Sequence, residues 1–207
     1  MKIKHKNTIF ILLTFIVIVQ AYFLYKATEN QYIASMDRKY HEARFSKMPL
    51  GDNPVLGQDT SSIKILVYID YQCQYSLKFI QEQLPLLNEA FIKKGLVQVV
   101  FKDYPLYDNE SSLKLARSAH IAYKKGVFER FLKNVLAQKV ENEAHLSTTT
   151  MLNLAGINKE IARNKLLAGV AGINSTPSFI INRKLFKGMM ENDKLIFLIE
   201  QLLAGSK

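Results

Sequence analysis

The chain contains a single cysteine, Cys73, and its position indicates thiol chemistry. It stands where a predicted strand over residues 63–70 gives way to a predicted helix. The free N–H groups and the positive dipole end at a helix start stabilise an anion, and the thiolate is the nucleophile in disulfide exchange. One cysteine cannot form an intrachain disulfide. It is therefore a reactive thiol, an intermolecular link or a buried small apolar side chain.

The elements that position Cys73 can be predicted from hydrophobic patterning. Residues 63–70 form a short apolar run typical of a buried strand, and residues 96–106 predict a second strand. Between them, apolar residues recur at intervals of three and four, which predicts an amphipathic helix. These residues are Leu77, Ile80, Leu84, Leu87 and Phe91. Pro85 is expected to kink this helix, and Gly95 to end it.

Residues 109 to about 170 are predicted to be helical, with one helix ending at Gly156 and another following it. Residues 177–182 and 184–188 then predict a hairpin across Arg183, and residues 191–205 a final amphipathic helix. The order is strand, helix, strand, helical block, hairpin, helix. It predicts an α/β fold in which a parallel βαβ unit is followed by an antiparallel pair.

The N-terminus has a basic start and an apolar stretch that continues to Tyr25. Residues 1–26 are predicted to be a signal anchor, with residues 9–25 crossing the membrane and the lysines keeping the N-terminal end in the cytoplasm. A cleaved signal peptide, with a site near Ala21, and a buried core helix are the alternatives. Residues 27–50 predict a polar stalk and residues 51–207 the globular domain.

The chain of 207 residues has a net charge of +10, which favours acidic partners, but it carries no helix-turn-helix pattern, RNA-binding signature or zinc-finger spacing. Nucleic-acid binding is therefore not expected. No cofactor or metal is expected either, because the four histidines show no metal-ligand spacing with each other or with Cys73. They are His5, His41, His120 and His145.

Five stretches together resemble the DsbA-like branch of the thioredoxin family. In order they are "DNPVLG", "IKILVYIDYQCQYS", "EQLPLL", "VVFKDYPL" and "GINSTPSFIIN". The resemblance covers residues 51–207. It implies a thioredoxin-like fold with a helical insertion at about residues 108–170, here preceded by an N-terminal transmembrane helix.

The resemblance also implies roles for particular residues. Cys73 corresponds to the attacking cysteine of the family's Cys-x-x-Cys motif, and Ser76 stands where the resolving cysteine is expected. Pro177 corresponds to the family's cis-proline, although a trans bond is the default for a proline considered alone. The predicted catalytic residues are Cys73 and Ser76, and the predicted substrate-binding residues are Gln74, Tyr75, Thr176 and Pro177.

Serine cannot form a disulfide, so the chemistry left to this site is monothiol. The prediction is an extracytoplasmic thiol–disulfide oxidoreductase of isomerase or reductase type, with Ser76 donating a hydrogen bond to the Cys73 thiolate. The alternative is a binding module that has lost turnover and acts as a chaperone or an accessory subunit of an envelope complex. Expected partners are cysteine-containing envelope or secreted proteins, with a small thiol or a membrane redox protein as a further candidate. The expected location is the cell membrane, with a single pass and the domain in the periplasm or outside the cell.

Three other positions near the strand ends carry polar side chains. Asp70 is expected either to be solvated at the rim of the site or to tune the thiol. His120 is expected to be a satisfied or surface histidine rather than the partner of Cys73 in a peptidase dyad. Residues 102–104 are expected to close the second strand near the same rim.

Overall fold

The computed structural model describes residues 13–28, 50–106, 110–139 and 148–205, in two units, Met1–His41 and Glu42–Lys207. In the first unit, residues 13–28 form a helix whose large apolar side chains are exposed. Within the part of the chain that the structure describes, no helix is long and apolar enough to cross a membrane. Residues 9–12 of the predicted span, and most of the predicted stalk, lie outside the described residues.

The second unit is built on a five-stranded sheet with the order β1-β3-β2-β4-β5. Its strands are β1 (Val55–Leu56), β2 (Ile63–Ile69), β3 (Val97–Asp103), β4 (Ser178–Ile181) and β5 (Lys184–Lys187). The pair β2–β3 is parallel, and β4 runs antiparallel to both β2 and β5. The predicted βαβ unit and hairpin are thus confirmed. Strand β1 was not predicted, because two residues are too few to show a period.

Residues 74–92 form a continuous helical stretch made of four pieces: α2 (Gln74–Lys78), η1 (Phe79–Gln83), α3 (Leu84–Leu87) and η2 (Asn88–Ile92). The two η segments are π-helical turns. They flank α3, in which Pro85 stands near the start. Proline lacks the N–H that an α-helical hydrogen bond needs, so the irregularity predicted at Pro85 takes the form of wider turns around it.

The helical insertion between β3 and β4 consists of α4 (Glu110–Lys124), α5 (Phe128–Leu136) and α6 (Thr148–Val170). Residues 140–147 of the predicted block lie outside the described residues. The predicted helix end at Gly156 is wrong, because α6 runs through it. A glycine costs a helix interior about 1 kcal/mol. Here Ile157 and Ile161 of α6 pack in a buried cluster with Ala116 and Ile121 of α4, which compensates for that cost.

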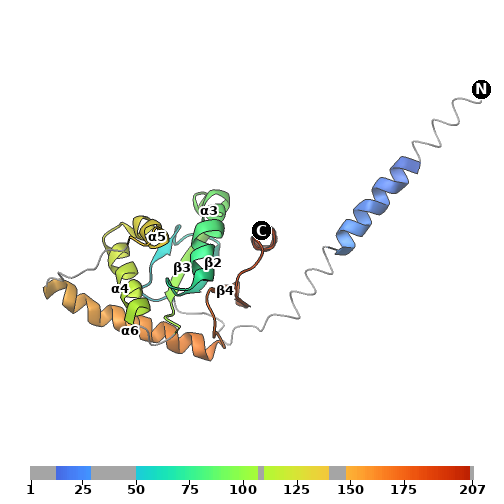
Figure 1. Cartoon of the computed structure of the whole chain (residues 1–207). Helices are drawn as coiled ribbons and strands as arrows, with labels where there is room; N and C mark the ends of the chain where they lie inside the picture. The colour runs from blue at the N-terminus through green and yellow to red at the C-terminus, as the bar shows by residue number, and fades with distance from the viewer. Residues whose placement is uncertain (1–12, 29–49, 107–109, 140–147, 206–207) are drawn as a thin grey trace, which may run out of the picture. The chain divides into compact units, whose positions relative to one another are not determined.

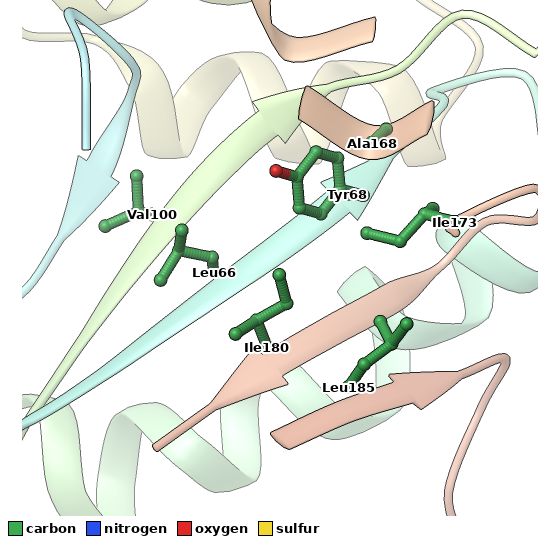
Figure 2. Close-up of a cluster of buried hydrophobic side chains, with 7 residues drawn as sticks. All are labelled: Leu66, Tyr68, Val100, Ala168, Ile173, Ile180 and Leu185. Atoms are coloured by element: carbon green, nitrogen blue, oxygen red, sulfur yellow. The ribbon is translucent and has the colours of Figure 1, made fainter. Parts of the chain in front are cut away.

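One face of the sheet is covered by α6. Because side chains alternate along a strand, Leu66 and Tyr68 of β2 point to the same face. Figure 2 shows them packed beneath Ala168, near the C-terminal end of α6, in a cluster that extends across the sheet. The cluster comprises Leu66, Tyr68, Val100, Ala168, Ile173, Ile180 and Leu185.

The opposite face is covered by residues 74–92 and by α5. The ring of Phe79 lies 5.2 Å from that of Phe179 on β4, and the ring of Phe128 on α5 lies 4.9 Å from that of Phe101 on β3. In Figure 1, α6 (orange) and the stretch that contains α3 (green) accordingly lie on opposite sides of the strands. The chain ends in α7 (Asn192–Ala204). This layered arrangement brings the end of β2, where Cys73 follows, between the insertion and the loop before β4.

Candidate active site

Cys73 is the N-cap residue of α2, so it lies at the junction that the sequence predicted. Its φ and ψ of −75° and 121° are extended rather than helical. Its N–H donates to the Asp70 carbonyl at 3.0 Å, and its own carbonyl accepts the first helical hydrogen bond, from Leu77 N at 2.9 Å. The backbone is thus fixed on both sides of Cys73, while the side chain remains partly exposed.

The loop before β4 lies against the thiol. Cys73 Sγ donates to the Thr176 carbonyl oxygen at 3.3 Å, although the two residues are 103 positions apart. The Thr176–Pro177 peptide bond is cis, as the family resemblance implied and contrary to the default for an isolated proline. Both residues are buried, and the Pro177 carbonyl accepts a hydrogen bond from Gly188 N at 2.9 Å. Two of the predicted substrate-binding residues are therefore brought to Cys73.

Ser76 does not make the predicted hydrogen bond to Cys73. Its side chain is fully buried, and among the described residues no group is hydrogen-bonded to its Oγ. The Cys73 thiol donates to Thr176 instead. A buried hydroxyl without a partner costs about 1–3 kcal/mol relative to a satisfied one. Ser76 therefore occupies an enclosed position beneath the start of the helix without holding the sulfur.

Gln74 and Tyr75 are exposed, and Tyr75, which is 56% accessible, borders an open pocket of about 590 Å³. The opposite wall is the segment that leads into α7. Buried Gln83 holds this wall, because its Nε2 donates to the Met190 carbonyl at 2.6 Å and to Asn192 Oδ1 at 2.9 Å. The pocket is lined by Tyr75, Lys78, Glu82, Met189, Met190, Glu191, Asn192 and Asp193. Two flexible methionines and several charges give it an amphipathic character.

Asp70 is buried, so the expectation that it is solvated at the rim is wrong. Its Oδ1 accepts from Gln72 N at 2.9 Å, which closes a tight turn immediately before Cys73. Its Oδ2 accepts from Leu106 N at 3.0 Å and from Ser112 Oγ at 3.1 Å. The carboxylate thus joins the turn, the segment after β3 and α4. Sequence inspection cannot reveal this, because one of the partners lies 42 residues away.

The end of β3 carries a buried contact between a carboxyl and an imidazole rather than rim residues. His120 Nε2 of α4 lies 2.7 Å from Asp103 Oδ2, and both side chains are almost completely inaccessible. Burial raises the pKa of Asp103, while His120 opposes the shift. Burial together with the nearby Asp103 carboxyl also holds the pKa of Tyr71 well above its usual value. His120 is therefore a buried core histidine whose Nε2 lies next to Asp103, which argues against a peptidase dyad with Cys73.

Lys102 is also fully buried, with its Nζ 2.5 Å from the Leu50 carbonyl oxygen and 4.0 Å from Glu160 Oε1. Burial lowers the pKa of Lys102 from 10.5 to about 8, although the Glu160 carboxylate partly opposes the shift. Asn53 extends the network by donating to Glu160 Oε1 at 2.8 Å. This network fixes the segment that enters the domain between β3 and α6.

Two residues near the site escaped sequence analysis. Ser112 and Gln83 lie in helices, where a polar residue is usually on the solvent side, and only the tertiary contacts show that both are buried. The serine that precedes Ser112 is exposed, so composition alone does not distinguish the two.

The chain belongs to the thioredoxin family: the family model described as Thioredoxin matches residues 50–201. The solved structures that it resembles include BdbD from Bacillus subtilis in oxidised form, with a TM-score of 0.65, 20% identity, and coverage of 79% of this chain and 100% of that one. The thiol-disulfide exchange protein alpha-DsbA2 from Wolbachia pipientis has a TM-score of 0.60 and 24% identity, with coverage of 72% and 87%. The predicted DsbA-like thioredoxin fold is thereby confirmed.

A curated relative is the probable disulfide bond formation protein D of Bacillus anthracis. The two sequences are 29% identical over 102 residues, which is 48% of this chain and 46% of the relative. The match thus spans about half the length of that protein.

Proposed function

We propose that the chain is a membrane-tethered, extracytoplasmic thiol–disulfide oxidoreductase of monothiol type. The observation that carries the proposal is the placement of the partly exposed Cys73 sulfur at a helix start, 3.3 Å from the carbonyl before a cis-proline. A cysteine that only filled a core position would need neither the accessibility nor this contact. The names of the relatives, which refer to disulfide bond formation and to thiol–disulfide exchange, support the same general activity.

The reaction uses one protein sulfur. The Cys73 thiolate attacks one sulfur of a substrate disulfide, a mixed disulfide forms, and the other substrate sulfur leaves as a thiolate that takes up a proton. If a second thiolate of the same substrate then attacks the substrate sulfur of the mixed disulfide, Cys73 is released and the substrate disulfide is rearranged without net oxidation. If two equivalents of a small thiol complete the release, the substrate is reduced and the small thiol becomes the disulfide. Ser76 leaves no internal disulfide to store the two electrons.

Substrates on this proposal are cysteine-containing envelope or secreted proteins that dock beside the sulfur. Thr176 and Pro177 would contact the substrate chain next to its reacting cysteine. The exposed side chains of Gln74 and Tyr75, together with the pocket beside Tyr75, would contact residues on the other side. The methionines of that pocket favour adaptable rather than sequence-specific binding.

The membrane tether rests on the apolar N-terminal helix. Nine large apolar residues between positions 13 and 25 are 48–68% exposed, and burying such surface in lipid is favourable by about 25 cal/mol per Å². The lysines that precede the apolar run favour a cytoplasmic N-terminus, which places the domain outside the cytoplasm, in the periplasm or at the outer side of the cell membrane.

The alternative is a binding module, and the presence of Ser76 at the resolving position favours it. Turnover distinguishes the enzyme from this alternative. The full chain in mild detergent is mixed with a four-cysteine peptide whose two disulfides are both in a non-native pairing, with and without reduced glutathione. We expect multiple turnovers per protein that disappear in Cys73→Ala. Peptide binding without any disulfide rearrangement or reduction would establish the binding module instead.

A further inference from the structure

We propose that Ser112, in the helical insertion, is a positioning residue for Cys73. The proposal rests on the function proposed above, since it concerns how the reactive sulfur is presented. Ser112 lies in the first turn of α4 and is only 3% exposed, so its hydroxyl is directed into the protein. It reaches the turn formed by residues 70–72, which lies immediately before the thiol.

The contacts converge on that turn from a distant part of the chain. Ser112 Oγ lies 3.1 Å from Asp70 Oδ2 and 3.1 Å from Gln72 Oε1. A hydroxyl has only one proton, so it cannot donate to both oxygens. If the Gln72 amide is rotated by 180°, its NH₂ group donates to Ser112 Oγ and the hydroxyl donates to Asp70. The Ser112 hydroxyl then accepts from Gln72 and donates to Asp70, which uses its one proton once.

The turn transmits this constraint to the sulfur through two hydrogen bonds. Asp70 Oδ1 accepts from Gln72 N, and the Asp70 carbonyl accepts from Cys73 N at 3.0 Å. The orientation of the Asp70 side chain and the backbone direction at Cys73 are therefore linked. On the other side, Cys73 Sγ contacts Thr176. Ser112 thus fixes the backbone on one side of the thiol, and the loop that contains Thr176 lies on the other side.

A second contact from the same helix supports this role of α4. His120 pairs with Asp103, and the Asp103 carboxyl in turn interacts with Tyr71, the middle residue of the turn. Residues 70, 71 and 72 are thereby all connected, directly or through one intermediate, to α4. Contacts from the helical insertion therefore stabilise the turn that precedes Cys73.

The test compares two reactions of the same sulfur in the full chain in mild detergent. Alkylation by iodoacetamide requires only an accessible thiolate, whereas exchange with a peptide disulfide also requires the sulfur to be aligned with the docked S–S bond. The ratio of the exchange rate to the alkylation rate therefore reports positioning. Circular dichroism identifies variants in which Cys73 is exposed by partial unfolding. In a variant that remains folded, a substitution that affects only stability would not lower the ratio.

We expect Ser112→Ala to lower the ratio about tenfold, the equivalent of one hydrogen bond of about 1.4 kcal/mol, and Ser112→Thr, which keeps the hydroxyl, to stay within about twofold of the wild type. Ser118→Ala is the matched control, because Ser118 is also buried in α4. An equal ratio in the Ser112→Ala and Ser118→Ala variants would overturn the proposal.

Two further outcomes remain informative. If Ser112→Ala does not fold, Gln72→Ala replaces it, since the Gln72 side chain is exposed; an unchanged ratio in that variant overturns the proposal. If the wild type alkylates but never exchanges, the proposed function fails. The alkylation rates of the variants then decide the role of Ser112. A rate that changes in Ser112→Ala but not in Ser118→Ala supports positioning of the sulfur, and equal rates in the two variants overturn it.

Discussion

Lys102 should make the domain more stable as the pH rises above 7, which is unusual for a basic side chain in a folded protein. Its Nζ is fully buried near Leu50 and Glu160, and burial lowers its pKa from 10.5 to about 8. Between pH 8 and 10.5 the unfolded chain therefore binds more protons at this lysine than the folded chain does. Stability increases with pH wherever the unfolded state binds more protons.

The magnitude follows from the two pKa values. For a single group that titrates near 8 when folded and near 10.5 when unfolded, the free energy of unfolding increases by about 2 kcal/mol between pH 7 and 9.5. Above pH 10 the trend reverses, because burial raises the pKa of Tyr68 and Tyr71, and the unfolded chain then loses phenolic protons that the folded chain retains. The useful window therefore ends near pH 9.5.

Urea unfolding of the full chain in mild detergent, followed by far-UV circular dichroism at several pH values in this window, measures the effect. Lys102→Met removes the titrating group and should flatten the pH dependence by about 2 kcal/mol. Lys94→Met, the same substitution at an exposed lysine, should leave it unchanged. Equal pH dependence in wild type and Lys102→Met would refute the reasoning from burial.

Three other experiments test different parts of the account. Ser76→Cys should create a reducible intrachain disulfide with Cys73, because the two positions are one helical turn apart. Two thiols that alkylate independently in an oxidising glutathione buffer would contradict this geometry. His120→Leu should lower the free energy of unfolding by roughly 3 kcal/mol, because it leaves Asp103 buried without its imidazole partner. The double variant with Asp103→Leu should recover part of the loss. Equal stability of the single and double variants would argue against the pairing of His120 with Asp103. In spheroplasts, external protease should digest residues 27–207, and protection of the domain there with digestion in inverted vesicles would exclude the proposed topology.

The strands and most helices could be predicted because their patterns are local. The apolar runs of β2 and β3 describe strands that are buried along almost their whole length, and the periodicity of residues 77–91 describes the buried face of a helix. The errors arose where tertiary contacts outweigh local preference. Gly156 does not end a helix, because the apolar side chains that follow it anchor α6 against α4. Strand β1 exists only through its pairing with β3.

The candidate site could be predicted only in part. The position of Cys73 at a strand–helix junction follows from patterning, whereas the assignment of Thr176 and Pro177 to the same site came from the family resemblance and not from spacing. The role of Asp70 could not be predicted, since its hydrogen bonds with Ser112 and Leu106 depend on how the insertion folds back over the turn. The missing hydrogen bond of Ser76 is likewise a matter of side-chain direction, which residue type does not determine.

The central claim, that Cys73 performs thiol–disulfide exchange without a resolving thiol, is tested most directly by trapping its intermediates. Cells that produce the full chain under oxidising conditions are quenched with acid, free thiols are alkylated, and the proteins are separated on a non-reducing gel. The account predicts mixed-disulfide adducts that collapse to the free chain with reductant and that are absent in Cys73→Ala. A wild-type chain that runs only as the alkylated monomer would contradict the claim and would leave Cys73 as a packing residue.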